Sequence, residues 1–240
     1  MRYAICIFLL ILCGCVTKNP PSDILSPTSP NLFSVATTVR DSNNKLPVHI
    51  YIEGDGNAFN GVGRPTSDPT PRGTTVRDMV AADDYPNVAY IARPCQFYMD
   101  PKCTVHDWTD GRFSKPIIDS VANAIKQIAK GRPVILIGYS GGAMVSGLVI
   151  KNNPDINIKN WITIAGVLNH HDWTEYFGDA PLSASMDMTT LPNVSQHHFV
   201  AANDRVVPPE LSKKWIPAQK MTIIPDATHT HFPQSFIIIK

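Results

Sequence analysis

Short apolar segments alternate with segments of helical periodicity along most of the chain. Residues 48–53 alternate apolar and polar side chains, whereas residues 134–137 (VILI) are entirely apolar. A short, fully apolar run is typical of a strand that is covered on both faces of a parallel sheet. The expected strands are residues 32–40, 48–53, 87–93, 134–137, 161–165, 198–202 and 221–224.

The expected helices lie between these strands. Apolar residues recur every three or four positions after Ser114, and Pro116 suits the first turn of such a helix. Further helices are expected over residues 142–151 and from Glu210. Residues 167–192 have no clear period and are expected to form an irregular insertion over the sheet edge. This alternation predicts an α/β fold, with a mainly parallel sheet and helices on both faces.

The first residues have the pattern of an export signal. Arg2 precedes a continuous apolar run over residues 4–12, about half of the roughly 20 residues that a membrane-spanning helix needs. Residues 12–15 (LCGC) then resemble the lipobox of bacterial lipoproteins, in which the final cysteine accepts a diacylglycerol. We therefore expect a signal peptide over residues 1–14 and lipidation of Cys15. The alternatives are a plain secretory signal and a leader whose cysteines have no role.

The next segment separates the expected anchor from the folded body. Residues 15–31 contain four prolines and many Ser, Thr and Asn residues, which predicts a Pro/Ser-rich tether. One α/β domain is expected over residues 32–240, because a chain of 240 residues is too short for two well-buried domains. The expected location is the bacterial cell envelope, facing the periplasm, and Val16 favours the outer membrane over the inner one.

The charge of the chain is balanced. Its 21 basic residues face 20 acidic ones, and removal of the leader with Arg2 would leave equal numbers. This balance gives no electrostatic argument for nucleic acid, and no nucleic-acid partner is expected. Membrane contact is expected through the N-terminal lipid anchor.

Two cysteines remain for the folded body once the leader and the lipid acceptor are set aside. These are Cys95 and Cys103, and an even number of cysteines in an exported protein favours a disulfide between them. The alternative is a pair of free buried thiols.

Residues 138–142 (GYSGG) carry the clearest indication of chemistry. This G-x-S-x-G motif directly follows one expected strand and directly precedes an expected helix. That setting is typical of a nucleophile elbow, a tight turn that presents a strained serine. Gly138 and Gly142 are expected there because side chains at both positions would collide across the turn. Ser140 is therefore the predicted nucleophile.

A serine nucleophile needs a base, and the base needs an acid that orients it. In a fold with a nucleophile elbow, the acid follows a late strand and the histidine follows the last strand. Asp204 comes soon after residues 198–202, and His229 follows residues 221–224. We therefore predict a triad of Ser140, Asp204 and His229.

Neighbouring residues leave alternatives open. His231 lies two positions after His229 and is a second candidate base, and Asp226 is a second candidate acid in the same short loop. The two histidines could also be read as metal ligands, but no cluster of cysteines or carboxylates at metal spacing accompanies them. No metal is expected, and the triad chemistry requires no organic cofactor.

An oxyanion hole needs two backbone donors. One is expected from Gly141, directly after the nucleophile, and the other from the loop that follows an earlier strand. Here residues 53–56 (EGDG) follow the strand at residues 48–53, so the second donor is expected from Asp55 or Gly56. The alternative is a Gly/Asp turn with no part in chemistry.

These features together resemble a group of small bacterial α/β-hydrolase lipoproteins. The matching residues are Tyr51-Ile52-Glu53-Gly54-Asp55-Gly56, Arg93-Pro94-Cys95-Gln96, Cys103, Trp108, Arg112, Gly138-Tyr139-Ser140-Gly141-Gly142, Asn203-Asp204 and Ala227-Thr228-His229. The resemblance covers nearly the whole mature body. It implies the α/β-hydrolase fold and the triad, but no substrate. Trp108 and Arg112 either line the site or brace it, and bracing is the expected role.

The expected function is hydrolysis of carboxylic esters or related acyl substrates, either small molecules or lipids. A serine peptidase or amidase would use the same triad, because pocket shape and leaving-group protonation distinguish these reactions. A non-catalytic envelope protein that keeps the fold for binding is the third alternative.

Overall fold

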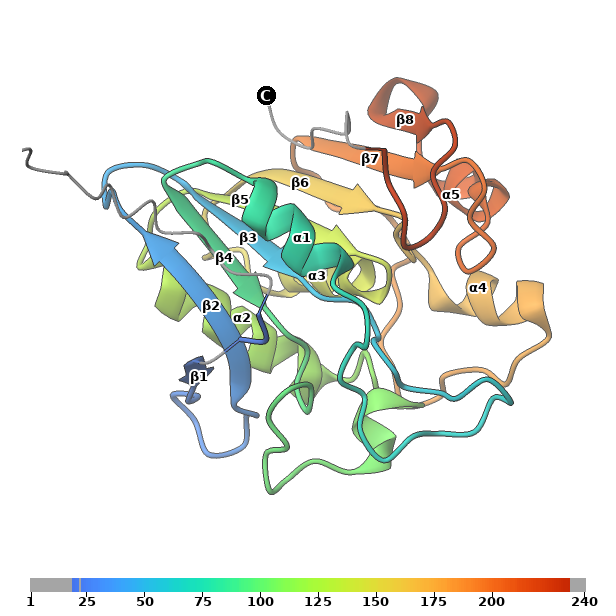
Figure 1. The fold of residues 1–240 in the computed structure, drawn as a ribbon, viewed down its shortest axis with the longest axis horizontal. Helices are drawn as coiled ribbons and strands as arrows, with labels where there is room; N and C mark the ends of the chain where they lie inside the picture. Colours follow the sequence, from blue (N-terminus) through green and yellow to red (C-terminus); the bar gives the residue numbers. More distant parts are fainter. Residues whose placement is uncertain (1–18, 22, 234–240) are drawn as a thin grey trace, which may run out of the picture.

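The computed structural model describes residues 19–21 and 23–233 (Figure 1). The predicted signal peptide, the lipidation site Cys15 and residues 234–240 lie outside the described residues. None of the described helices has the length and apolar character needed to cross a membrane.

The described residues form one eight-stranded mixed sheet. Its strands are β1 (Asp23–Leu25), β2 (Val35–Asp41), β3 (Val48–Ile52), β4 (Asn87–Ile91), β5 (Val134–Tyr139), β6 (Ile158–Ile164), β7 (Gln196–Ala201) and β8 (Met221–Ile224). They lie in the order β1-β2-β4-β3-β5-β6-β7-β8. All neighbours from β4 to β8 are parallel, whereas β2 runs antiparallel to β4 and to β1. The predicted mainly parallel sheet is confirmed.

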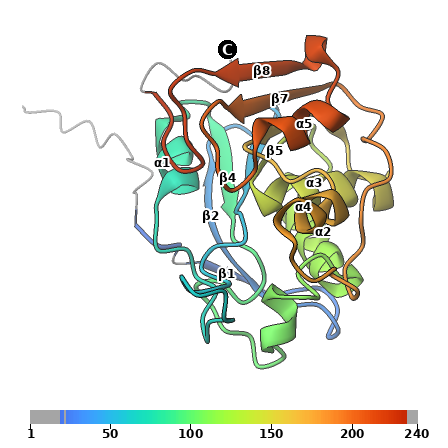
Figure 2. The same ribbon diagram turned by 90° about the vertical axis from the view of Figure 1, so that its right-hand side faces the viewer.

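Helices cover both faces of this sheet. Helix α1 (Thr75–Ala82) lies on one face, and α2 (Lys115–Ala129) and α3 (Gly141–Asn152) lie on the other, as Figures 1 and 2 show. Helices α4 (His170–Phe177) and α5 (Pro209–Trp215) follow β6 and β7. Two short 3₁₀ turns, η1 (Val105–Trp108) and η2 (Ala218–Lys220), complete the described elements.

The core has two parts, because successive side chains of each strand point to opposite faces of the sheet. Ile50 and Leu136 belong to the cluster that packs with α2 and α3, and Tyr51 and Ile137 belong to the cluster on the α1 face. The central strands β3 and β4 are buried at every position, because helices cover both of their faces.

Part of the segment expected to be a tether belongs to the sheet. Asp23–Leu25 pairs antiparallel with β2, and Leu25 packs against the core. The side chain of Gln127 on α2 donates a hydrogen bond to the carbonyl of Ser26 (3.0 Å). The proline-rich composition of this segment predicted no strand, but a short strand at the edge of a sheet tolerates neighbouring prolines.

Two helices were not predicted. Helix α1 follows a loop rich in Pro and Gly that obscures its start, and α4 lies within residues 167–192, which were expected to be irregular. Asn169 begins α4, where its side chain accepts a hydrogen bond from the backbone N–H of Asp172 (2.7 Å), and Gly178 ends it. These capping residues were the available signal for a helix of only eight residues.

The predicted disulfide is present. Cys95 and Cys103 are bonded within the long loop that joins β4 to α2. Cys95 is buried beside Trp108, and the Trp108 indole N–H donates to the carbonyl of Thr66 (3.1 Å). Trp108 therefore braces this loop, as expected.

Candidate active site

Ser140 sits on the turn between β5 and α3, at the carboxyl end of the sheet. Its backbone has φ 52° and ψ −125°, a conformation that non-glycine residues rarely adopt. A Cβ on Gly138 would lie 2.5 Å from the carbonyl oxygen of Gly142, and a Cβ on Gly142 would lie 2.5 Å from the carbonyl oxygen of Ile52. These distances are too short for any side chain, so the turn needs both glycines.

Two hydrogen bonds join Ser140 to His229 and His229 to Asp204. Ser140 Oγ lies 3.0 Å from His229 Nε2, and His229 Nδ1 lies 2.8 Å from Asp204 Oδ2. An ionised carboxylate only accepts, so Nδ1 carries the proton of a neutral imidazole. Nε2 is then free to accept the proton of the serine hydroxyl. The three residues, which are far apart in sequence, meet in the order that a nucleophile, a base and an acid require.

Asp204 is fixed by the backbone that follows it. Its Oδ1 accepts hydrogen bonds from the N–H groups of Val206 and Val207, both at 2.8 Å. Oδ2 remains for His229, and the side chain is fully buried. Asp226, the second candidate acid, instead occupies the turn after β8 with φ 59° and is exposed.

Contacts from elsewhere in the chain hold the loop that carries His229. The Tyr139 hydroxyl donates to the His229 carbonyl (2.8 Å), and Thr75 Oγ1 donates to the Thr230 carbonyl (3.2 Å). Ser140 hydrogen-bonds to His229, whereas His231, the second candidate base, is exposed.

The loop after β3 lies directly against the elbow. A Cβ on Gly54 would be 3.0 Å from the Cβ of Ser140, and a Cβ on Gly141 would be 2.0 Å from Asp55 Oδ1. Within the described part of the chain, the backbone N–H groups of Gly141, Asp55 and Gly56 donate to no protein acceptor. They are the predicted oxyanion donors, and the choice between Asp55 and Gly56 stays a prediction.

Glu53 holds the start of this loop. Its carboxyl group accepts the backbone N–H of Gly54 (3.0 Å) and the hydroxyl of Tyr90 (2.8 Å). The Gly54 N–H is thereby unavailable to an oxyanion. Burial raises the pKa of Glu53, because desolvation penalises its charged form.

Two arginines at the oxyanion loop were not predicted as site residues. Arg93 Nη1 donates to Asp55 Oδ1 (2.9 Å), and Arg112 Nε lies 3.3 Å from Asp55 Oδ2. Both side chains are buried, and burial lowers the pKa of Arg93. The available signal was a pair of arginines in the loop that also holds the disulfide. Arg112 contacts the predicted oxyanion loop through Asp55, so whether it lines the site or braces it stays a prediction.

A small pocket adjoins the elbow. It is shallow, with room for about one water molecule, and most of its walls are apolar. The pocket is lined by Gly166, Val167, Leu168, Asn169, Asp172, Trp173, Val207, Leu211 and Trp215. The Val167 N–H donates to the Ser140 carbonyl (3.1 Å), which places one wall of this pocket beside the backbone of Ser140.

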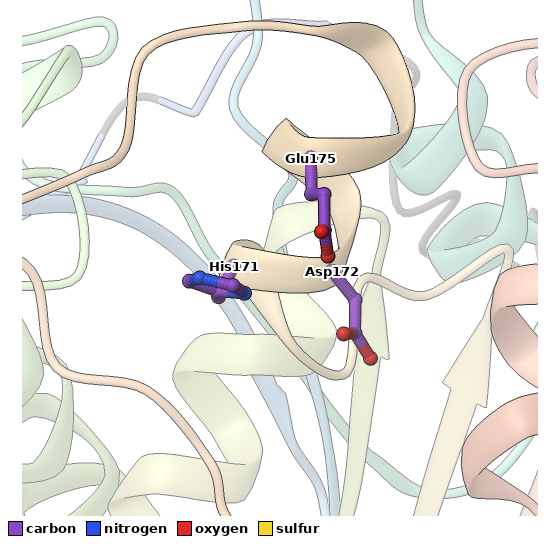
Figure 3. Close-up of side chains that lie close together, drawn as sticks. All are labelled: His171, Asp172 and Glu175. Atoms are coloured by element: carbon purple, nitrogen blue, oxygen red, sulfur yellow. The ribbon is translucent and has the colours of Figure 1, made fainter.

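One other cluster of potential metal ligands lies on α4. His171, Asp172 and Glu175 have ligand atoms within 4.8 Å of one another (Figure 3). Both carboxylate oxygens of Asp172 are already bonded, one to Lys214 Nζ and one to the Trp215 indole N–H, each at 2.6 Å. His171 and Glu175 are exposed, so this cluster resembles an ordinary polar helix surface.

No family model matches the sequence, and no curated protein matches it either. Solved structures do match the fold. A serine hydrolase without a lid, XC6422 from Xanthomonas campestris, is 16% identical with a TM-score of 0.53, over 88% of this chain and 86% of that one. Est1E from Butyrivibrio proteoclasticus is 15% identical with a TM-score of 0.56, over 87% and 91%. Mouse alpha/beta hydrolase domain-containing protein 10 is 15% identical with a TM-score of 0.57, over 86% and 90%.

These matches cover nearly the whole described sheet and its helices. Their sequence identities are low, so the matches support a conclusion about the fold only. Together with the strand order, the antiparallel β2 and the turn between β5 and α3, they establish that the chain has the α/β-hydrolase fold.

Proposed function

We propose that this protein is a serine hydrolase that cleaves carboxylic esters or related acyl compounds, with Ser140, His229 and Asp204 as its triad. The observation that carries the proposal is the continuous pair of hydrogen bonds from Ser140 through His229 to Asp204. The structural neighbours that are named serine hydrolases or esterases support it through their shared fold.

The reaction follows from the positions of the three side chains. His229 Nε2 removes the hydroxyl proton of Ser140 as Oγ attacks the substrate carbonyl, and the imidazolium then protonates the leaving alcohol. The resulting acyl-serine is cleaved by a water molecule that gives its proton to His229 in turn. Asp204 keeps the proton on Nδ1 and stabilises the transient imidazolium.

The negative charge on the former carbonyl oxygen develops beside the amino end of α3. The Gly141 N–H and one N–H of Asp55 or Gly56 would stabilise it, together with the positive end of the helix dipole. Loss of one such donor typically lowers the rate by about 10²–10³.

Covalent labelling tests the proposal directly. A fluorophosphonate probe should label the wild-type protein, and Ser140→Ala and His229→Ala should lose the label. His231→Ala is the matched control and should keep it. Absence of labelling in correctly folded wild type would refute the proposal. A panel of ester, thioester and peptide substrates then separates esterase from peptidase activity.

We also propose that Cys15 is lipidated and anchors the protein to the cell envelope. The sequence of residues 12–15 (LCGC) after an apolar run supports this proposal. In a bacterial host fed a labelled fatty acid, Cys15→Ala should lose the label and leave the membrane fraction. Cys13→Ala keeps a small residue at its position and should retain both, and label retained by Cys15→Ala would refute the anchor.

A further inference from the structure

A charge cluster of two buried arginines and the partly exposed Asp55 borders the proposed oxyanion hole. The Asp55 carboxylate contacts two guanidinium groups, Arg93 at 2.9 Å and Arg112 at 3.3 Å. Arg93 is further satisfied, because its Nη2 donates to the carbonyl of Arg112. Glu53, the neighbouring carboxyl group, accepts its hydrogen bonds from the Tyr90 hydroxyl and the Gly54 N–H and not from these arginines. One carboxylate is therefore shared by two cations.

Arg112 has more unused donors than Arg93: the buried Nε of each is without a hydrogen bond, but both terminal nitrogens of Arg93 are bonded. The Nε of Arg112 is buried and, although 3.3 Å from Asp55, makes no hydrogen bond of acceptable geometry. Among the described residues, no acceptor is hydrogen-bonded to either terminal nitrogen of its guanidinium, and no other carboxylate forms an ion pair with it. Of its three nitrogens only Nε is buried without a partner, so the two terminal nitrogens remain open to water or to a ligand.

Aromatic rings hold this guanidinium in place. Its Cζ lies 5.8 Å from the ring centre of Phe59, 5.7 Å from that of Phe113 and 5.6 Å from that of Trp173. Three cation–π contacts from three separate segments fix the side chain without using any of its hydrogen-bond donors. The arrangement leaves a positioned fork of donors, which suits the two oxygens of a carboxylate.

The donors lie close to the proposed chemistry. Asp55, which Arg112 contacts, crowds the Cα of Gly141 directly after the nucleophile. Trp173, which packs on Arg112, also lines the pocket beside Ser140. A substrate carbonyl held at Ser140 would thus lie next to Gly141, which Asp55 connects to this guanidinium.

We propose that Arg112 binds a carboxylate on the acyl part of the substrate, so that the enzyme prefers half-esters of dicarboxylic acids over neutral esters. The inference rests on the proposed hydrolase function. Arg93 and Arg112 outnumber the one carboxylate, Asp55, that pairs with them, so this place favours an anion. Arg112 is then a specificity-determining residue, and Asp55 and Arg93 hold it in position.

Matched substrates test this preference. The 4-nitrophenyl half-esters of succinate, glutarate and adipate are each compared with the methyl-capped neutral counterpart, with the rate of Ser140→Ala subtracted as background. For at least one chain length, wild type should show a kcat/KM about 10- to 100-fold higher for the half-ester, the range expected of charge-assisted hydrogen bonds. Arg112→Gln should lower that ratio to near one.

Lys102→Gln is the matched control, because Lys102 is a half-exposed cation of the same loop that pairs with Asp100. It should leave the ratio unchanged. If Arg112→Gln lowers kcat/KM equally for the half-ester and the neutral ester, Arg112 only braces Asp55 and the proposal is overturned. A wild-type preference for the neutral esters would also overturn it.

A second measurement needs no folded variant of Arg112. Glutarate should inhibit wild-type hydrolysis of 4-nitrophenyl acetate competitively, and the uncharged diamide of glutaric acid should not. If wild type is neither labelled by fluorophosphonate nor active on any ester, the hydrolase proposal fails first. Stabilisation of Ser140→Ala by glutarate, measured as a shift in melting temperature, then decides separately whether the anion site exists.

Discussion

Replacement of Asp204 by asparagine separates the role of the acid from the packing around it. Asparagine has nearly the same shape, and its carbonyl oxygen can keep the hydrogen bonds from Val206 and Val207. Its amide nitrogen then faces His229 Nδ1 at the 2.8 Å position where Asp204 Oδ2 now accepts. An amide NH₂ only donates, so Nδ1 must become an acceptor and the imidazole proton must move to Nε2.

The size of the effect follows from this change of tautomer. With its proton on Nε2, His229 meets the Ser140 hydroxyl, 3.0 Å away, as a donor and can no longer remove its proton. The charge that stabilises the imidazolium is lost as well. The same exchange in a serine protease triad lowers kcat by about 10⁴, so we expect a loss of about 10³–10⁴ here.

Initial rates of 4-nitrophenyl ester hydrolysis measure this loss, and circular dichroism shows that the variant is folded. Asp226→Asn is the matched control, since Asp226 has a left-handed backbone that asparagine also tolerates. It should stay within about twofold of wild type, as surface changes usually have small effects. A rate for Asp204→Asn within tenfold of wild type would refute the assignment of the acid.

Three further predictions concern stability. Removal of the disulfide by the double variant Cys95→Ser, Cys103→Ser should lower the free energy of unfolding by about 2–3 kcal/mol in thermal melts, because the bond closes a short loop; an unchanged melting temperature would contradict this. Burial lowers the pKa of His198 from 6.5 to about 4, so between these pH values the unfolded state binds one more proton than the folded state, and the free energy of unfolding falls as the pH drops. In urea titrations between pH 6.5 and pH 4, the fall in the free energy of unfolding should be about 3 kcal/mol smaller for His198→Gln than for wild type, and an equal fall in both proteins would refute this. Gly142→Ala should cost about 1–3 kcal/mol or more because its Cβ meets backbone atoms, whereas Gly61→Ala, which faces open space, should be close to neutral in the same melts.

The central part of the fold was predictable from the sequence because its signals are local. The fully apolar run at residues 134–137 and the glycines around Ser140 together specify a buried strand, a strained turn and a helix. The structure places β5 and α3 there, with boundaries that differ by one or two residues. The expected strand at residues 221–224 matches β8 at both ends, since turn residues bound it on each side.

Elements that depend on distant partners were not predictable in this way. Strand β1 has three residues and exists because β2 offers it an edge, which no local pattern reveals. Arg112 appears in the sequence as one charged residue in a loop. Its place beside the oxyanion loop results from packing against Phe59 and Trp173, which lie far away in sequence.

The motif around Ser140 does not by itself position the loop that carries His229, the proposed base. The elbow fixes Ser140 through its own glycines, but β8 is a short edge strand that cannot by itself fix the loop carrying His229. Thr75 and Tyr139 help to hold that loop, and Tyr139, which lies inside the elbow motif, donates a hydrogen bond to the His229 carbonyl. The variable residue of the motif thus joins the turn of Ser140 to the loop of the proposed base. A phenylalanine there would keep the ring contact with His229 but release the carbonyl, so the fold would survive while the alignment of the base with Ser140 would weaken.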